Sequence, residues 1–225
     1  MRCVDKGIAP QIYAYYKQAR NDLGDRIGWI CSYCEMPVKN MIEVEHVHPI
    51  REGGDELEWD NFLLSCRYCN GVKNNRNANR AGYLWPDVDN SILAFEYSEL
   101  HVIEPAGDLA PEITNMAQRT IDLMGLNRHP GLVNEPTDAD SRWIHRIEAW
   151  GIIEESYSDW INNRSPAFAR QIARTALGQG FYSFWIKKFC DERMVINEIN
   201  HIFPNTYQPK FNADNELVLR PNGSF

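Results

Sequence analysis

Apolar residues recur every three or four positions between residues 111 and 124, in a run that begins at Pro111 and stops at Gly125. A proline in the first turn and a glycine just beyond the last turn are typical of a helix, so this spacing predicts one. By the same reasoning we expect helices from about 141 to 161 and from 166 to about 177. One or two further helices should fill 181–203, where Pro204 ends the apolar pattern.

The first eighty residues show a different pattern. Helical spacing is present only at 10–23, which predicts an opening helix that ends at Gly24. Residues 38–47 suit a short hairpin that turns at Lys39 and Asn40, and Gly53 and Gly54 then supply the sharp loop needed before the stretch 59–64. A short helix is expected from Asn70 onward. The predicted order in this part is therefore strand, strand, helix.

Two strand-like runs, 93–97 and 100–103, follow residue 80 and are separated by Ser98 and Glu99, which predicts a second hairpin. Helical patterns account for most of the remaining chain. We therefore expect an α+β protein with two parts, residues 1–80 with a core module at 29–80, and a mainly helical accessory region at 81–225. A chain of 225 residues with 44% hydrophobic residues is long enough for one sizeable core or two smaller ones.

The chain shows no export signal at its N-terminus and no apolar run near the roughly 18 residues that a membrane span needs. We therefore expect a cytoplasmic protein that does not enter a membrane. Six cysteines are too few and too unevenly placed for a secreted disulfide scaffold. In a reducing compartment their thiols would be free to bind metal, although Cys3 and Cys190 are read as small residues without chemistry.

Four of the cysteines form two Cys-x-x-Cys motifs, Cys31 with Cys34 and Cys66 with Cys69. Each motif places two sulfurs on one side of a tight loop, and two such loops complete a tetrahedron around zinc. Such a site has no open coordination position. The zinc would thus be structural, and a catalytic ion would have to bind elsewhere. The alternatives, unligated thiols or a redox pair, fit a doubled motif less well.

Between the two motifs lie residue types that suit hydrolysis. Glu45 offers a hard oxygen ligand for magnesium or manganese, and His46 beside it is an imidazole that can take a proton from water near pH 7. Asn61 is an amide that can hold the histidine loop through backbone hydrogen bonds. Asn70 directly follows the last cysteine, so zinc binding would fix its position.

Charge is divided unevenly along the chain. Residues 1–80 contain 11 basic and 11 acidic residues, so the whole net charge of −8 resides in 81–225. The stretch 67–80 contains four cations and no acid. We therefore predict that Lys73 and Arg76 contact a phosphate backbone, against the alternative of an ordinary solvated helix face.

Together, Cys31-x-x-Cys34, Glu45-His46-x-x-Pro49, Trp59-x-Asn61 and Cys66-x-x-Cys69-Asn70-x-x-Lys73 resemble the HNH endonucleases, in the branch with a four-cysteine zinc site. The resemblance covers roughly residues 29–80 and implies the ββα-metal fold. It implies that His46 is the general base, that Asn61 orients it, and that Glu45 and Asn70 hold the catalytic ion. Oxygen ligands favour Mg²⁺ or Mn²⁺ at that site. His48 is a second imidazole nearby, considered as an alternative ligand.

A narrower resemblance links the chain to the small HNH nucleases of bacterial anti-phage systems, the PtuB-like proteins among them. It rests on the Glu-His pair, on the opening helix before Trp29-x-Cys31, and on Leu126-Asn127. It implies antiviral defence beside an ATPase partner protein. The motifs beyond residue 80 are loose, and the role of 81–225 does not follow from them.

These observations predict metal-assisted hydrolysis of phosphodiester bonds, with double-stranded DNA as substrate. One motif cuts one strand, so a monomer would nick and a double-strand break would need two copies. Two alternatives remain open: a zinc-ribbon module that binds nucleic acid without cutting it, and a partner-recognition protein dominated by its acidic helical part. The aromatic run 181–185 is more typical of a core than of a platform for bases.

Overall fold

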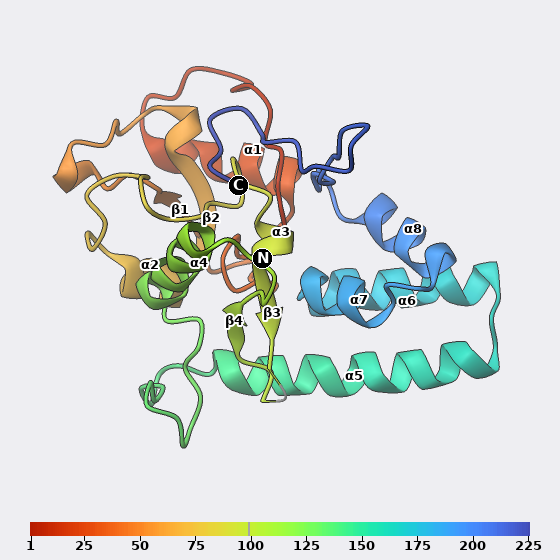
Figure 1. Ribbon diagram of the computed structural model, residues 1–225. Helices are drawn as coiled ribbons and strands as arrows, with labels where there is room; N and C mark the ends of the chain where they lie inside the picture. The colour runs from red at the N-terminus through yellow and green to blue at the C-terminus, as the bar shows by residue number, and fades with distance from the viewer. Residues whose placement is uncertain (99) are drawn as a thin grey trace.

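The computed structural model describes residues 1–98 and 100–225 (Figure 1). Its strands are β1 (Ile42–His46), β2 (Phe62–Cys66), β3 (Phe95–Tyr97) and β4 (Ile103–Pro105). The helices are α1 (Ala19–Ile27), α2 (Arg67–Lys73), α3 (Ser91–Ala94), α4 (Pro111–Met124), α5 (Arg142–Asn162), α6 (Pro166–Gln179), α7 (Tyr182–Lys188) and α8 (Arg193–Ile202). Short 3₁₀ turns are η1 (Tyr16–Gln18), η2 (Ile50–Glu52) and η3 (Trp59–Asn61). The α+β class is confirmed.

β1, β2 and α2 form the expected strand–strand–helix unit. β1 pairs antiparallel with β2, with Glu45 opposite Leu63 and His46 opposite Phe62. Every residue of β2 is buried, which explains why all of them but Ser65 are apolar. The local hairpin expected over 38–47 is wrong, because the partner of β1 is β2. Val38 instead donates its N–H to Trp29 O and closes the loop of the first cysteine motif.

The opening helix begins later than its apolar spacing predicts. α1 starts at Ala19 after the turn η1, and Ile12 is almost fully exposed. It also runs past Gly24 to Ile27. A Cβ at Gly24 would lie 2.5 Å from the ring of Trp29, so this glycine allows close packing within the helix and does not end it. Gly28, with φ of +81°, takes the end position.

The first core continues beyond residue 80. The paired strands β3 and β4 form the second predicted hairpin, and the expected turn residue Glu99 lies outside the described residues. α4 packs on both α2 and β4, and it runs from Pro111 to Gly125 as its sequence predicts. Buried residues of 84–126 belong to the same cluster as those of β1 and β2. The division of the chain at residue 80 stays a prediction, and the first core crosses it.

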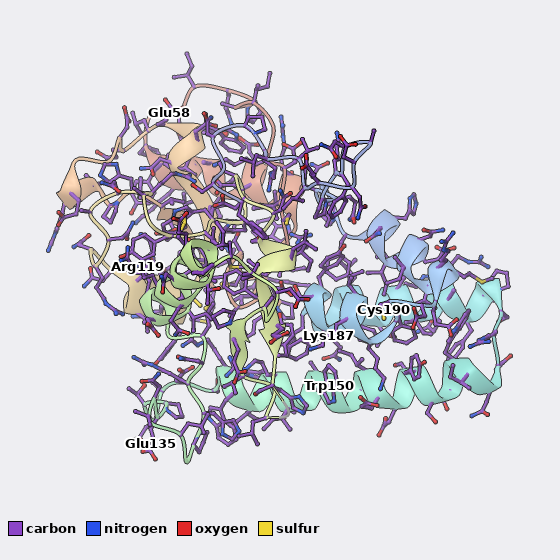
Figure 2. The ribbon with its side chains drawn as sticks, viewed as in Figure 1. Glu58, Arg119, Glu135, Trp150, Lys187 and Cys190 are labelled. Atoms are coloured by element: carbon purple, nitrogen blue, oxygen red, sulfur yellow. The ribbon has the colours of Figure 1, made fainter. Side chains whose placement is uncertain are left out.

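The second core lies between α5, α6, α7 and α8, which extend to one side of the first core (Figure 1). Trp150 of α5, labelled in Figure 2, packs edge-on against Phe184 of α7, with ring centroids 5.4 Å apart. All of residues 181–185 are buried, so the core reading of this aromatic run is confirmed. Among the described residues, no helix is both long and apolar enough to cross a membrane.

Glu35, one residue after the first cysteine motif, joins the two cores. Its buried carboxylate accepts hydrogen bonds from the backbone N–H and the hydroxyl of Ser183, at the start of α7. Its carbonyl accepts from Phe181 N at 2.9 Å. Gly180 passes so close that a Cβ there would lie 2.4 Å from Glu35 O, and its φ is +74°. Only glycine fits this crossing.

The C-terminal segment returns to the first core above α1 (Figure 1). Thr206 bridges to Val4, and the buried side chain of Arg220 donates to the carbonyls of Val4, Pro86 and Asp89. Residues at the two ends of the chain thus pack on the same core.

We predict that Gly180→Ala lowers the free energy of unfolding by about 1–3 kcal/mol, because a β-carbon is strained at this φ and meets Glu35 O. Gly178→Ala is the matched control. Gly178 lies in α6 with open space around its Cα, so alanine there should raise stability by up to about 1 kcal/mol. Urea unfolding followed by circular dichroism measures both. Equal stabilities of the two variants would contradict this account of the crossing.

Candidate active site and metal centre

The sulfurs of Cys31, Cys34, Cys66 and Cys69 all lie within 4.8 Å of one another, and all four residues are buried. Cys34 Sγ and Cys66 Sγ are 3.8 Å apart. Zinc–sulfur bonds of about 2.3 Å in a tetrahedron require sulfur–sulfur edges of about 3.8 Å. The four residues therefore fit a zinc ion, as the sequence predicts.

Thiol chemistry at this cluster also favours a cation. Burial alone would raise the pKa of Cys31, but hydrogen bonds from the three other thiols lower it well below its usual value. The pKa of Cys34 is raised well above normal by its hydrogen bonds with the same neighbours. One thiolate thus suppresses ionisation of the next, and a divalent cation is the group that allows all four to ionise together.

The second cysteine motif is held from both ends. Cys66 ends β2 and caps α2, since its sulfur accepts from Cys69 N at 3.3 Å. Arg142, at the start of α5, donates to Cys69 Sγ at 3.2 Å and also to the carbonyls of Met124 and Gly125. Burial alone would lower the pKa of Arg142, but the negative charge at Cys69 and Asp140 raises it. A charged guanidinium therefore supports the metal site from the helical part of the chain.

His46 ends β1, and its ring packs edge-on against Tyr16 and Phe62. Its Nε2 lies 3.0 Å from Glu56 O. A carbonyl oxygen only accepts hydrogen bonds, so Nε2 carries the proton and Nδ1 keeps the lone pair. The ring is thus fixed in the tautomer in which Nδ1 can act as a base.

Asn61 fixes the backbone just after this histidine. Its Oδ1 accepts from His48 N at 2.7 Å, and its Nδ2 donates to His48 O and to Asp55 O. These are the backbone hydrogen bonds that the sequence predicts for an amide at this position. Below the same turn, the buried ammonium of Lys6 donates to the carbonyls of Trp59, Asp60 and Phe62.

Glu45, expected to be a ligand of the catalytic ion, is 2% exposed and fully paired. Lys73 Nζ lies 2.5 Å from its Oε1, and the hydroxyl of Tyr33 donates to its Oε2. Burial, together with the charge of Glu45, raises the pKa of Tyr33 well above its usual value, so this hydroxyl stays a donor. Lys73 also donates to His46 O at 2.8 Å.

An open groove of about 690 Å³ runs along β1 and α2. Asn70 lies there and donates its Nδ2 to Glu43 Oε2 at 2.8 Å. The groove is lined by polar and aromatic side chains that include Tyr16, Glu43, His46, Arg51, Arg67 and Asn70. His46 and Asn70, predicted as site residues, therefore share one groove, and Glu43 joins them although the sequence analysis did not single it out.

The predicted phosphate contact of Lys73 stays a prediction, and the structure argues against it, because its side chain is 1% exposed and paired with Glu45. Arg76 is exposed, but its guanidinium donates to the carbonyls of Leu123 and Asp122 at the end of α4. Arg80 forms two hydrogen bonds with Asp87. Of the four cations in 67–80, only Arg67 lines the groove.

Arg51 also lines the groove and is exposed. The sequence alone did not point to Arg51, because the five acids of the neighbouring stretch 52–60 mask the cation in the local charge pattern. The signal available in the sequence was that Arg51 closely follows Pro49 of the Glu45-His46-x-x-Pro49 motif. Arg51 and Arg67 approach the groove from different elements, η2 and α2.

The family model for HNH endonucleases matches residues 31–76. This match begins at the first zinc-type cysteine and spans β1, β2 and α2, so the chain carries an HNH endonuclease module of the four-cysteine type. A search of curated proteins found no match to the chain.

We predict that Cys66→Ser and Cys31→Ser each yield a protein with one zinc fewer. Thermal unfolding of each variant should lose its cooperative transition or shift it to a lower temperature. Structural zinc contributes about 10–16 kcal/mol in small zinc modules, and Cys66 also caps α2. Cys190→Ser is the control, because Cys190 is exposed and lies outside the cluster. Plasma emission and a thermal melt provide the readouts. A zinc-free variant with a wild-type melt would contradict the structural role.

Proposed function

We propose that the chain is an endonuclease that hydrolyses phosphodiester bonds in DNA at the groove along β1 and α2. One observation carries this proposal: His46 and Asn70 line the same open groove, and the hydrogen bond from His46 Nε2 to Glu56 O leaves Nδ1 as the nitrogen that can accept a proton. Oxygen donors on both walls of the groove suit Mg²⁺ or Mn²⁺. The HNH match over 31–76 supports the same reaction class.

In this reaction His46 Nδ1 takes a proton from water, which then attacks phosphorus in line with the leaving 3′-oxygen. The carbonyl of Glu56 accepts a hydrogen bond from the opposite edge of the ring, which favours this orientation of the base. Asn61 orients this base through the His48 backbone. A divalent ion, held by Asn70 and a carboxylate of β1, would stabilise the charge that develops on the phosphate and leaving group.

Phosphate on either side of the cleaved bond would contact Arg51 and Arg67. Both guanidinium groups are exposed, and a planar guanidinium can bind two phosphate oxygens at once. These two arginines replace Lys73 and Arg76 in the proposal. DNA is the substrate that this arrangement favours, and one module per chain would produce a nick, whereas two copies would be required for a double-strand break.

The helical part is proposed to bind a protein partner. Residues 81–225 carry the whole net charge of −8, and like charge repels a phosphate backbone. The resemblance to anti-phage HNH nucleases supports an ATPase as that partner and bacterial defence as the role. An ATPase gene next to the gene for this chain is the observation that tests this part.

A zinc-ribbon module that binds DNA without cutting it is the second candidate. A plasmid-nicking assay with Mg²⁺ or Mn²⁺ separates it from the nuclease, because only the nuclease converts supercoiled plasmid to the open circle.

We predict that His46→Ala reduces the nicking rate by on the order of 10²-fold or more, because it removes proton transfer. DNA affinity and zinc content should stay at wild-type values. His48→Ala is the matched control, since its imidazole lines a separate pocket with Asn61 and bonds Glu52 O. The assay is single-turnover plasmid nicking. Wild-type nicking by His46→Ala, or loss only in His48→Ala, would contradict the base assignment.

Arg51→Ala and Arg67→Ala should each weaken DNA binding uniformly across sequences. Each should also reduce, by roughly one unit, the magnitude of the slope of the logarithm of the binding constant against the logarithm of the salt concentration. Binding is measured by fluorescence anisotropy in the His46→Ala background, so that no DNA is cut during the titration. Arg170→Ala is the control, because Arg170 is an exposed arginine on α6, a helix that belongs to the second core and not to the groove. A changed slope in the control alone would place the DNA surface on the helical part.

A further inference from the structure

Two glutamates of β1, Glu43 and Glu45, point to the same face of the strand because side chains alternate along it. That face looks toward α2, which carries Asn70 and Lys73. Both carboxylates line the groove, but their surroundings differ. Which of them can bind a cation is therefore decided by their contacts.

Glu45 has both oxygens engaged inside the protein. One lies 2.5 Å from Lys73 Nζ, and the other accepts from Tyr33. Coordination of an ion by Glu45 would break this pair and leave the ammonium of Lys73, itself 1% exposed, without its counter-charge. An unpaired buried charge is strongly unfavourable, so the pair resists release of its carboxylate.

Glu43 is only half-buried and bonds a different partner. Its Oε2 accepts from Asn70 Nδ2 at 2.8 Å, which also turns the amide so that Asn70 Oδ1 is its remaining acceptor. Among the described residues, no protein donor bonds Asn70 Oδ1 or Glu43 Oε1. Asn70 follows the zinc-type ligand Cys69 directly, so its position is fixed by that site. The side chains of Glu43 and Asn70 thus meet in the groove, and each keeps one hard oxygen that no protein donor among the described residues bonds.

We propose that Glu43, and not Glu45, is the carboxylate that holds the catalytic divalent ion together with Asn70. Glu45 and Lys73 then form a positioning pair, because Lys73 donates to His46 O and so fixes the backbone of the base. This assignment rests on the proposed function, since it names the ligand of that same site. It explains why the strand carries an acid at both positions: one acid binds the ion, and the other neutralises the lysine that holds His46.

The test measures Mn²⁺ binding by electron paramagnetic resonance on the zinc-loaded full chain, separately from plasmid nicking. Glu43→Gln should weaken Mn²⁺ binding at least about tenfold, as expected when a metal site loses a ligand. Glu43→Asp, which keeps the charge, should recover part of the affinity. Zinc content and a thermal melt of each variant report that the fold is intact.

The comparison variant is the double substitution Glu45→Gln with Lys73→Met, which removes both charges of the pair together and leaves no unpaired ion behind. It should bind Mn²⁺ with wild-type affinity. Its turnover should fall while its KM for DNA stays unchanged, because His46 loses a backbone contact and the groove keeps its phosphate contacts. That separation of kcat from KM is what a positioning pair predicts.

Each outcome decides the assignment. Loss of Mn²⁺ affinity in the double variant overturns it, whatever Glu43→Gln does, and so does wild-type affinity in Glu43→Gln. A wild-type protein that binds Mn²⁺ through Glu43 but does not nick plasmid contradicts the proposed function and leaves the assignment standing. If the wild-type protein nicks plasmid and Mn²⁺ affinity is lost only in the double variant, the proposed function stands and the assignment of Glu43 is wrong.

Discussion

The four-sulfur cluster is the constraint on which the rest of the module depends. It joins a loop at residues 31–34 to a strand end and helix start at 66–69, two segments that are otherwise linked by the hydrogen bond from Ser32 N to Leu64 O. Because Cys66 both ends β2 and caps α2, one tetrahedron fixes the direction of the strand and of the helix. Asn70 follows immediately, so its place in the groove is a consequence of the same geometry.

Buried polar contacts carry this rigidity to the reacting groups. Lys73 reaches from α2 to His46 O, Asn61 holds the backbone of His48, and Lys6 supports the turn that presents Asn61. Burial alone would raise the pKa of Asp87, but Lys6 and Arg80 lower it to about 2, so the partner of these cations is charged at neutral pH. Satisfied networks of this kind are rigid, because each member left unpaired would be costly. The backbone around the groove is therefore held by buried charges that are paired inside the protein.

What the sequence predicted well was local in origin. The cysteine spacing, the start of α4 at Pro111 and the cap of α6 at Ser165 follow from chemistry within a few residues, and each is present. The errors came from contacts between distant segments. Nothing local shows that β1 pairs with residues 62–66. Likewise Glu43 and Glu45 are equivalent along the strand, and only α2 and Tyr33 distinguish them.

The same distinction between local and overall properties resolves the charge of the chain. A net charge of −8 argues against DNA binding only if the charges act together, yet at physiological ionic strength charges separated by more than about 8 Å are largely screened. The negative charge resides in residues 81–140, which contain 11 acidic and 2 basic residues, whereas residues 141–225 contain 9 and 10. The helices α6, α7 and α8, on the side of the molecule away from β1 (Figure 1), therefore add almost no net charge. In the proposed function, a phosphate in the groove would meet Arg51 and Arg67, the two exposed cations that line it. Arg142, in the first turn of α5, connects this nearly neutral helical part to the metal site at Cys69.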